Sequence, residues 1–194
     1  MSALEQPHIS LAKYLEIERA AEFRSEYIDG DMLMMAGNTK EHIAIVGNIW
    51  AEFRAALRGR DCGTYGTEMR VKVDTDAYTY PDVAVACGEQ VFLGDPFDTL
   101  TNPSVIIEVL SKTTEGYDRG QKFGRYRRMP SLRQYVLVAQ NKVSVESYLR
   151  QPGEDWLLHE FDMLADTIPF PSLDCAISLS EIYYLVDFSR AMAR

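Results

Sequence analysis

Two strongly apolar segments, each interrupted by a single carboxylate, constrain this chain more than any other feature. "PDVAVACG" covers residues 81–88 and "PSVIIEVLSKTT" covers residues 103–114. Runs rich in Val, Ile and Ala are typical of buried strands, yet Asp82 opens the first run and Glu108 stands in the middle of the second. Burying a carboxylate costs several kcal/mol unless a partner compensates it. The segments therefore predict a sheet whose interior holds two charges that need a partner.

The chain length fits one well-buried domain and is short for two. With 194 residues, we expect a single domain over residues 1–194, with a core from about residue 10 to about residue 190. Apolar residues make up 46% and charged residues 25%, which excludes disordered and fibrous classes. The net charge of -9 argues against an unspecific polyanion binder. Any nucleic-acid contact must therefore come from a local patch.

The first residues, the apolar runs and the cysteines of the chain bear on the cellular compartment of the protein. The first residues carry no signal-peptide or transit-peptide pattern, and no apolar run approaches the roughly 18 residues of a membrane span. We therefore expect a soluble, cytoplasmic protein that does not contact a membrane. Cys62, Cys87 and Cys175 are odd in number and far apart, and they form no C-x-x-C pair. They are predicted to be packing thiols rather than a disulfide framework or a zinc site.

The order of predicted elements indicates a mixed fold. Ser10 and Thr39 are cap-type residues before two apolar helical patterns, and Asp29-Gly30 is a tight-turn dipeptide between two short strands. Further segments predict strands at 62–74, 81–88, 103–114, 133–140 and 142–150, a short basic helix at 118–130 and a closing helix at 178–192. This order predicts a single α/β or α+β domain with a mixed sheet flanked by helices.

The two carboxylate strands together suggest a metal site. If they are neighbours in one sheet, Asp82 and Glu108 could reach one end and one face. Mg²⁺ is held in proteins by one or two carboxylates together with waters and phosphate oxygens, and Mn²⁺ can substitute for it. Such a cation compensates the buried charges and lowers the pKa of a bound water. The pattern therefore indicates metal-assisted hydrolysis of a phosphodiester.

A basic helix follows the second carboxylate strand. "QKFGRYRRM" and its flanks hold the densest basic cluster of the chain, in which Tyr126 could stack on a base. We expect four nucleic-acid contacts here, at Arg119, Arg125, Tyr126 and Arg128. The alternative is a helix face that only packs and is solvated.

Several motifs in series resemble one known family. "YPDVAV", "IIEVLSKTTEGYDRGQKFGRYRRMPSLRQYVLV" and the upstream "RSEYIDGDMLMM" and "KEHIAIVGNI" resemble the Uma-two family of restriction-endonuclease-like proteins. That family is a branch of the PD-(D/E)XK nuclease superfamily, and the likeness covers nearly the whole chain in order. The resemblance implies a restriction-endonuclease-like fold, a central mixed β-sheet flanked by α-helices, with the site on the two carboxylate strands.

The resemblance also implies roles for individual residues. Asp82 matches the Asp of the "PD" motif and Glu108 the second acidic position, which are metal ligands in the superfamily, and Glu26 is a candidate additional acid. The superfamily usually places Lys two residues after the second acid, but Leu110 stands there. The lysine is expected to have moved to the following helix, which gives its role to Lys122.

Each of these residues has an alternative interpretation. Glu108 could form a buried structural ion pair, Lys122 could be a solvated helix residue with Lys112 in its role, and Glu26 could be an ordinary strand residue. His42 lies on the apolar stripe of the second helix, so it could be an inner-face histidine or an accessory residue that reaches the site.

The sequence therefore predicts a Mg²⁺-dependent endodeoxyribonuclease. Restriction-type enzymes commonly form twofold dimers that face two strands, so we expect a homodimer that acts on DNA. The alternative from another class is a catalytically inactive nuclease fold that binds nucleic acid or protein. An RNA-processing or repair nuclease would use the same residues.

Overall fold

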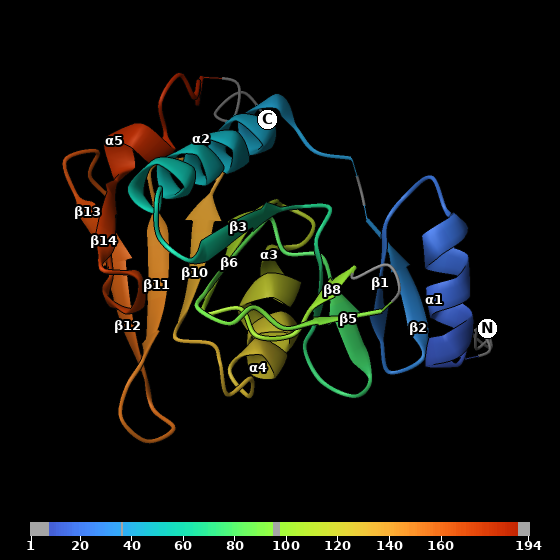
Figure 1. Cartoon of the computed structure of the whole chain (residues 1–194). Helices are drawn as coiled ribbons and strands as arrows, with labels where there is room; N and C mark the ends of the chain where they lie inside the picture. The colour runs from blue at the N-terminus through green and yellow to red at the C-terminus, as the bar shows by residue number, and fades with distance from the viewer. Residues whose placement is uncertain (1–7, 36, 95–97, 190–194) are drawn as a thin grey trace.

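A computed structural model describes residues 8–35, 37–94 and 98–189 of the protein. A six-stranded mixed sheet forms the centre of the fold (Figure 1). The strand order is β12-β11-β10-β9-β6-β3. β9 and β10 are parallel, and the other pairs are antiparallel. The bounds are β3 Cys62–Gly66, β6 Val83–Cys87, β9 Val105–Leu110, β10 Gln134–Ala139, β11 Val145–Arg150 and β12 Trp156–Phe161.

A second sheet stands beside the first, in the order β2-β1-β5-β4-β8-β7. The predicted turn at Asp29 and Gly30 joins β1 to β2, and both residues have positive φ, as a tight hairpin requires. A separate hairpin pairs β13 with β14. The bounds are β1 Ser25–Ile28, β2 Asp31–Met34, β4 Arg70–Lys72, β5 Ala77–Thr79, β7 Phe92–Leu93, β8 Thr99–Leu100, β13 Thr167–Phe170 and β14 Cys175–Ser178.

The helices begin where the sequence predicts caps. The Ser10 and Thr39 side chains accept hydrogen bonds from the backbone N–H groups three residues on, at the starts of α1 and α2. No helix in the described ranges is both long and apolar enough to cross a membrane. The bounds are α1 Leu11–Ala20, α2 Lys40–Ala56, α3 Glu115–Tyr117, a π-helix Asp118–Lys122, α4 Phe123–Tyr126, a 3-10 helix Pro171–Leu173 and α5 Leu179–Ile182.

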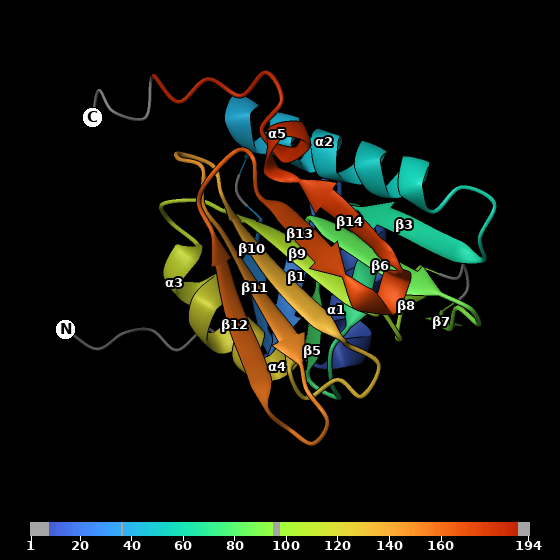
Figure 2. The same cartoon turned by 90° about the vertical axis from the view of Figure 1, so that its left-hand side faces the viewer.

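Strand alternation divides the core into two halves. Along β9, Val105, Ile107 and Val109 pack against α2, α5 and the β13–β14 hairpin. Ile106 and Leu110 face the opposite side, where they pack against Tyr126 of α4 and residues of the second sheet. Figure 2 shows α2 and α5 on one side of the main sheet and α3 and α4 on the other. Glu108 has the parity of the second set, so it points towards the segment that carries the basic helix.

The structure differs from the predicted elements in three respects. The strand expected over 62–74 is divided into β3 and β4, which belong to different sheets. Of the closing helix expected over 178–192, residues 190–192 lie outside the described residues, and in the described part of that range only α5 is helical. The Asn48 side chain donates hydrogen bonds to the Ile182 and Tyr184 carbonyls, and Leu185 has positive φ, so the helix ends early. The sequence prediction also lacked several strands. Among them, β12 extends the main sheet, β13 and β14 pair with each other in a sheet of their own, and β5, β7 and β8 belong to the second sheet.

The prediction that all three cysteines are packing thiols is wrong. Cys62 and Cys87 form a disulfide, and Cys175 is the one free thiol among the described residues. The cause is strand register, because β3 and β6 pair antiparallel with Cys62 directly opposite Cys87, at a Cα–Cα distance of 4.0 Å. The bond joins the edge strand β3 to β6, the strand that begins after Asp82.

Removing this disulfide should destabilise the protein. The bond closes a loop with a sequence separation of 25 residues, which corresponds to about 3.5 kcal/mol of chain entropy in the unfolded state. We expect the double variant Cys62→Ser/Cys87→Ser to lose stability of that order in urea unfolding under oxidising conditions. Cys175→Ser is the matched control and should unfold like the wild type. A reductant that leaves wild-type unfolding unchanged would contradict the prediction.

Candidate active site

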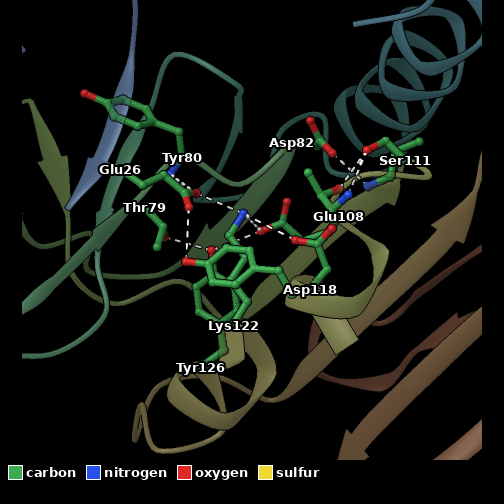
Figure 3. A network of polar contacts seen from close by, with 12 residues as sticks. Glu26, Thr79, Tyr80, Asp82, Glu108, Ser111, Asp118, Lys122 and Tyr126 are labelled. Carbon is green, nitrogen blue, oxygen red and sulfur yellow. Dashed lines mark hydrogen bonds and ion pairs between the residues drawn. The ribbon is translucent and has the colours of Figure 1, made fainter. Parts of the chain in front are cut away.

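The ammonium group of Lys122 lies at the centre of a buried acidic cluster (Figure 3). Its Nζ is 2.9 Å from Glu26 Oε1 and 3.0 Å from Glu108 Oε1, with Asp118 Oδ1 at 3.7 Å. All four residues are at most 7% exposed. One lysine from the π-helix therefore contacts carboxylates from both sheets and from its own helix.

Local backbone geometry explains how these side chains meet. Asp118 and Lys122 begin and end the π-helix, where a separation of four residues brings both to its buried side. In the main sheet, Val83 pairs with Ile107 in the antiparallel β6–β9 ladder. Continued by one residue, that register sets Asp82 opposite Glu108. The two carboxylates that the sequence singles out thus share one face of neighbouring strands.

Asp82 is held by two fixed donors. The backbone N–H of Val109 donates to Asp82 Oδ2 at 2.7 Å, and His42 Nε2 lies 2.9 Å from Asp82 Oδ1. Because a carboxylate only accepts, Nε2 is the protonated nitrogen of the His42 ring. His42 Nδ1 is buried and has no hydrogen-bond partner within the described ranges. The first turn of α2 therefore orients Asp82 in the site.

Tyr126 connects the site to both sheets. Its hydroxyl donates to Glu108 Oε1 at 3.1 Å and lies 2.8 Å from the Thr79 hydroxyl on β5. The ring is fully buried, and burial raises the pKa of Tyr126 well above its usual range. Glu26 has a second set of contacts, since it accepts from the Tyr80 backbone N–H and from the Tyr117 hydroxyl.

The cluster has more negative than positive charge, and its pKa values reflect the imbalance. Burial raises the pKa of Glu108 well above its usual range, because the attraction of Lys122 offsets burial only in part. Burial likewise raises the pKa of Asp118 against the attraction of Lys122. Burial alone would lower the pKa of Lys122, but Glu108 and Glu26 outweigh it and raise that pKa well above its ordinary value. A further cation would therefore be stabilised here.

The cluster opens into a cavity of about 560 Å³. Its floor contains the acidic residues and Lys122, and His42 closes one side. Leu33 and Met34 of β2 form an apolar wall, and the loop after β9 contributes Ser111 and Lys112. The reactive groups thus lie at the bottom of a pocket that solvent and a substrate can enter.

Comparison with known proteins identifies the family. The family model described as "Uma2: Putative restriction endonuclease" matches residues 11–180. This chain belongs to the Uma2 family. Two uncharacterised Synechocystis proteins are similar to it. One, slr1290, is 33% identical over 178 residues, covering 91% of this chain and 92% of that protein. The other, sll1609, is 35% identical over 153 residues, covering 78% of this chain and 86% of that protein.

A solved structure shares the fold of this Uma2 chain. It is described as a putative nuclease belonging to DUF820 from Anabaena variabilis, with a TM-score of 0.74 and 20% identity. The match covers 90% of this chain and 97% of that one. The expected α+β fold, with a central mixed sheet flanked by helices as in a nuclease, is therefore confirmed.

The donors in the Uma2 site fit a hard divalent cation. Glu108 Oε1 contacts Lys122 Nζ and the Tyr126 hydroxyl, and the residue lines the cavity. Asp82 adds oxygens that also line the cavity. No group of three or more His, Cys, Asp or Glu side chains in the described part of the chain is arranged to hold a metal. Two carboxylates completed by waters and substrate oxygens suit Mg²⁺ or Mn²⁺ rather than a structural zinc.

The structure brings together the residues that sequence analysis assigned to the Uma2 site. Glu26, Asp82, Glu108 and Lys122 all line the one cavity, as does the accessory candidate His42. Lys112, the rival to Lys122, also lines it but is exposed, and it forms no ion pair within the described ranges. Lys122 is therefore the lysine that contacts Glu108.

One of the four nucleic-acid contacts expected in the Uma2 helix needs correction, and the other three stay predictions. Tyr126 cannot stack on a base, because its ring is fully buried beneath the site. Arg119 is paired with Glu115 and Glu146, and Arg125 is paired with Asp29 and Asp74. Arg128 is exposed and carries no carboxylate partner in the described part of the chain.

Sequence reasoning missed Asp118 and Tyr117 of this Uma2 protein. Both line the cavity, and Asp118 is 3% exposed. A signal was present, since Asp118 precedes Lys122 by four residues, the spacing at which helical side chains pair. The sequence carries no sign of the π-helix, so the direction in which the Asp118 and Lys122 side chains point could not be predicted.

Proposed function

We propose that this Uma2 protein is a metal-dependent DNA endonuclease that hydrolyses phosphodiester bonds in the cavity around Lys122. The observation that supports the proposal most strongly is the convergence of Glu26, Asp82 and Glu108, from three separate strand segments, around one buried lysine in a pocket. Membership of a family described as "Putative restriction endonuclease" supports this reaction class. DNA as the substrate, the twofold dimer and the cellular compartment stay predictions.

The proposed roles follow from the contacts. Asp82 and Glu108 would hold Mg²⁺ or Mn²⁺, with His42 and the Val109 N–H orienting Asp82. When bound, the cation would lower the pKa of a water and stabilise the charge that develops on the phosphate. Lys122 would donate hydrogen bonds to a phosphate oxygen or to the attacking water. Glu26 would hold the Lys122 ammonium in position, 2.9 Å away.

Cleavage assays with an Asp82 variant test this proposal. Wild-type protein with Mg²⁺ or Mn²⁺ should cut single- or double-stranded DNA, and Asp82→Ala should cut at least about 100-fold more slowly. Asp155→Ala is the matched control, since Asp155 is exposed and lies in the β11–β12 turn. The proposal fails if wild type cuts no DNA with either ion, or if Asp82→Ala cuts as fast as the control.

One observation favours a second candidate, a nuclease fold that only binds nucleic acid or protein. Lys122 is already contacted by Glu26, Glu108 and Asp118, so the cluster holds together without a metal. Calorimetric titration with Mn²⁺ separates the two candidates. A binding module need not take up the ion, whereas the nuclease should show one site that Glu108→Ala removes.

A further inference from the structure

A second cavity, the arginine groove, lies apart from the catalytic pocket. It has a volume of about 960 Å³ and is lined by Arg127, Arg128, Arg150 and Trp156, among others. It lies between α4 and the turn that joins β11 to β12, which extends beside α4 in both views (Figures 1 and 2). Gln121 lines this groove and the next residue, Lys122, lines the catalytic pocket. The two cavities therefore adjoin different sides of one short helical segment.

The groove carries positive charge that the protein does not neutralise. Four arginines line the groove against two carboxylate residues, Asp29 and Glu154. Of these arginines, Arg127 and Arg128 are exposed and form no ion pair with a carboxylate in the described part of the chain. Arg125 differs, because Asp29 and Asp74 pair with it. Two adjacent unpaired arginines thus line this groove, in a chain of net charge -9. Because like charges repel, an anion in the groove would relieve the repulsion.

Arg150 fixes the shape of the groove. Its guanidinium donates to the backbone carbonyls of Leu132, Arg127 and Met129, and so holds the turn that presents the unpaired arginines. It also stacks on Trp156, with 4.6 Å between its central carbon and the ring centroid. Binding an anion there requires little reordering of the backbone.

We propose that the arginine groove binds the sugar-phosphate backbone of a nucleic-acid strand, outside the catalytic pocket. Guanidinium groups bind phosphate through two parallel hydrogen bonds, and several of them along a groove match the repeated phosphates of a strand. A volume of about 960 Å³ with several arginines on its lining suits a polyanion better than a single small anion. The proposal rests on the proposed function, because a nuclease substrate is the polyanion that must reach this part of the molecule.

Binding of a labelled single-stranded oligonucleotide, measured by fluorescence anisotropy without divalent cation, tests the groove. The double variant Arg127→Ala/Arg128→Ala removes two phosphate contacts. For single strands each contact contributes about 0.7 to the slope of log affinity against log salt. We therefore expect that slope to fall by about 1.4, and the dissociation constant at about 0.1 M salt to rise about 25-fold. Arg127→Lys/Arg128→Lys keeps the charge and should recover most of the salt dependence.

The control variant has the same change in charge at another place. Arg54 and Arg58 are exposed arginines near the end of α2, at a smaller cavity, and Arg54→Ala/Arg58→Ala should change the dissociation constant less than twofold. Equal weakening by both double variants, or none by the groove variant, would overturn the proposal. So would an inorganic polyphosphate that competes as strongly as the oligonucleotide. Because no cleavage is measured, this result is separate from failure of the nuclease proposal.

Discussion

Glu108→Gln is expected to abolish metal-dependent cleavage while making the metal-free protein more stable at neutral pH. Glutamine removes the charge that would bind the cation, so cleavage should fall at least about 100-fold. Its side chain still fits beside Tyr126, and Lys122 keeps Glu26 and Asp118 as partners. The variant therefore removes excess buried negative charge without leaving a buried cation unpaired.

The raised pKa of Glu108 determines the direction in which the stability of the protein changes with pH. Burial raises the pKa of Glu108 in the folded state above its unfolded value. A carboxyl with a raised folded pKa contributes stability that is fully present below the unfolded pKa, near pH 4, and lost as pH rises through the folded pKa. The metal-free wild type should lose that contribution on going to neutral pH. Glu108→Gln should show a flatter dependence.

Urea unfolding at several pH values, with and without Mg²⁺, measures both effects. Mg²⁺ should stabilise wild type more at neutral pH than near pH 4, and it should not stabilise Glu108→Gln. Glu160→Gln, an exposed change on β12, is the control and should behave as wild type in every assay. A Glu108→Gln protein that cleaves normally, or that is less stable than wild type at neutral pH, would refute the prediction.

The second large effect is expected for Lys122→Met, with the opposite sign for stability. The change leaves Glu26, Glu108 and Asp118 buried without their shared cation. Removing one partner of a buried ion pair destabilises a protein by about 3–5 kcal/mol. Met has a similar length, so loss of packing contributes little. Both the cleavage rate and the free energy of unfolding should therefore fall, whereas Glu108→Gln should lower only the cleavage rate.

Lys112→Met is the matched control for this second variant. Lys112 lines the same cavity but is exposed, so its replacement should leave the free energy of unfolding within about 0.5 kcal/mol of wild type. Mg²⁺ or Mn²⁺ should restore part of the stability of Lys122→Met, because a cation again neutralises the carboxylates. If Lys112→Met destabilises as much as Lys122→Met, Lys122 is not the compensating cation.

Features of the fold that depend on local sequence were predictable, and those that depend on long-range register were not. The caps at Ser10 and Thr39 and the turn at Asp29 act over a few residues, so a single sequence shows them. The Cys62–Cys87 bond depends on how β3 and β6 align, which composition does not encode. The closing helix is shortened by the side chain of Asn48, far away in the chain.

The same distinction applies to the site. Asp82 and Glu108 were visible because each carboxylate interrupts an apolar strand. Tyr126 looked like a surface residue in a basic helix, but the strand face beneath it is apolar and its ring packs there. The pairing of Arg125 with Asp74 joins segments whose contact is set by the second sheet. Contacts made between sheets could not be read from spacing along the chain.

The π-helix at Asp118–Lys122 makes the site sensitive to insertions and deletions. One residue fewer in this segment would turn every later side chain by about 100° around the helix axis. The Lys122 side chain would then lose its contact with Glu108, even if every residue identity were kept. In distant relatives, the number of residues between the second acid and the lysine should therefore report an intact site better than the presence of a lysine does.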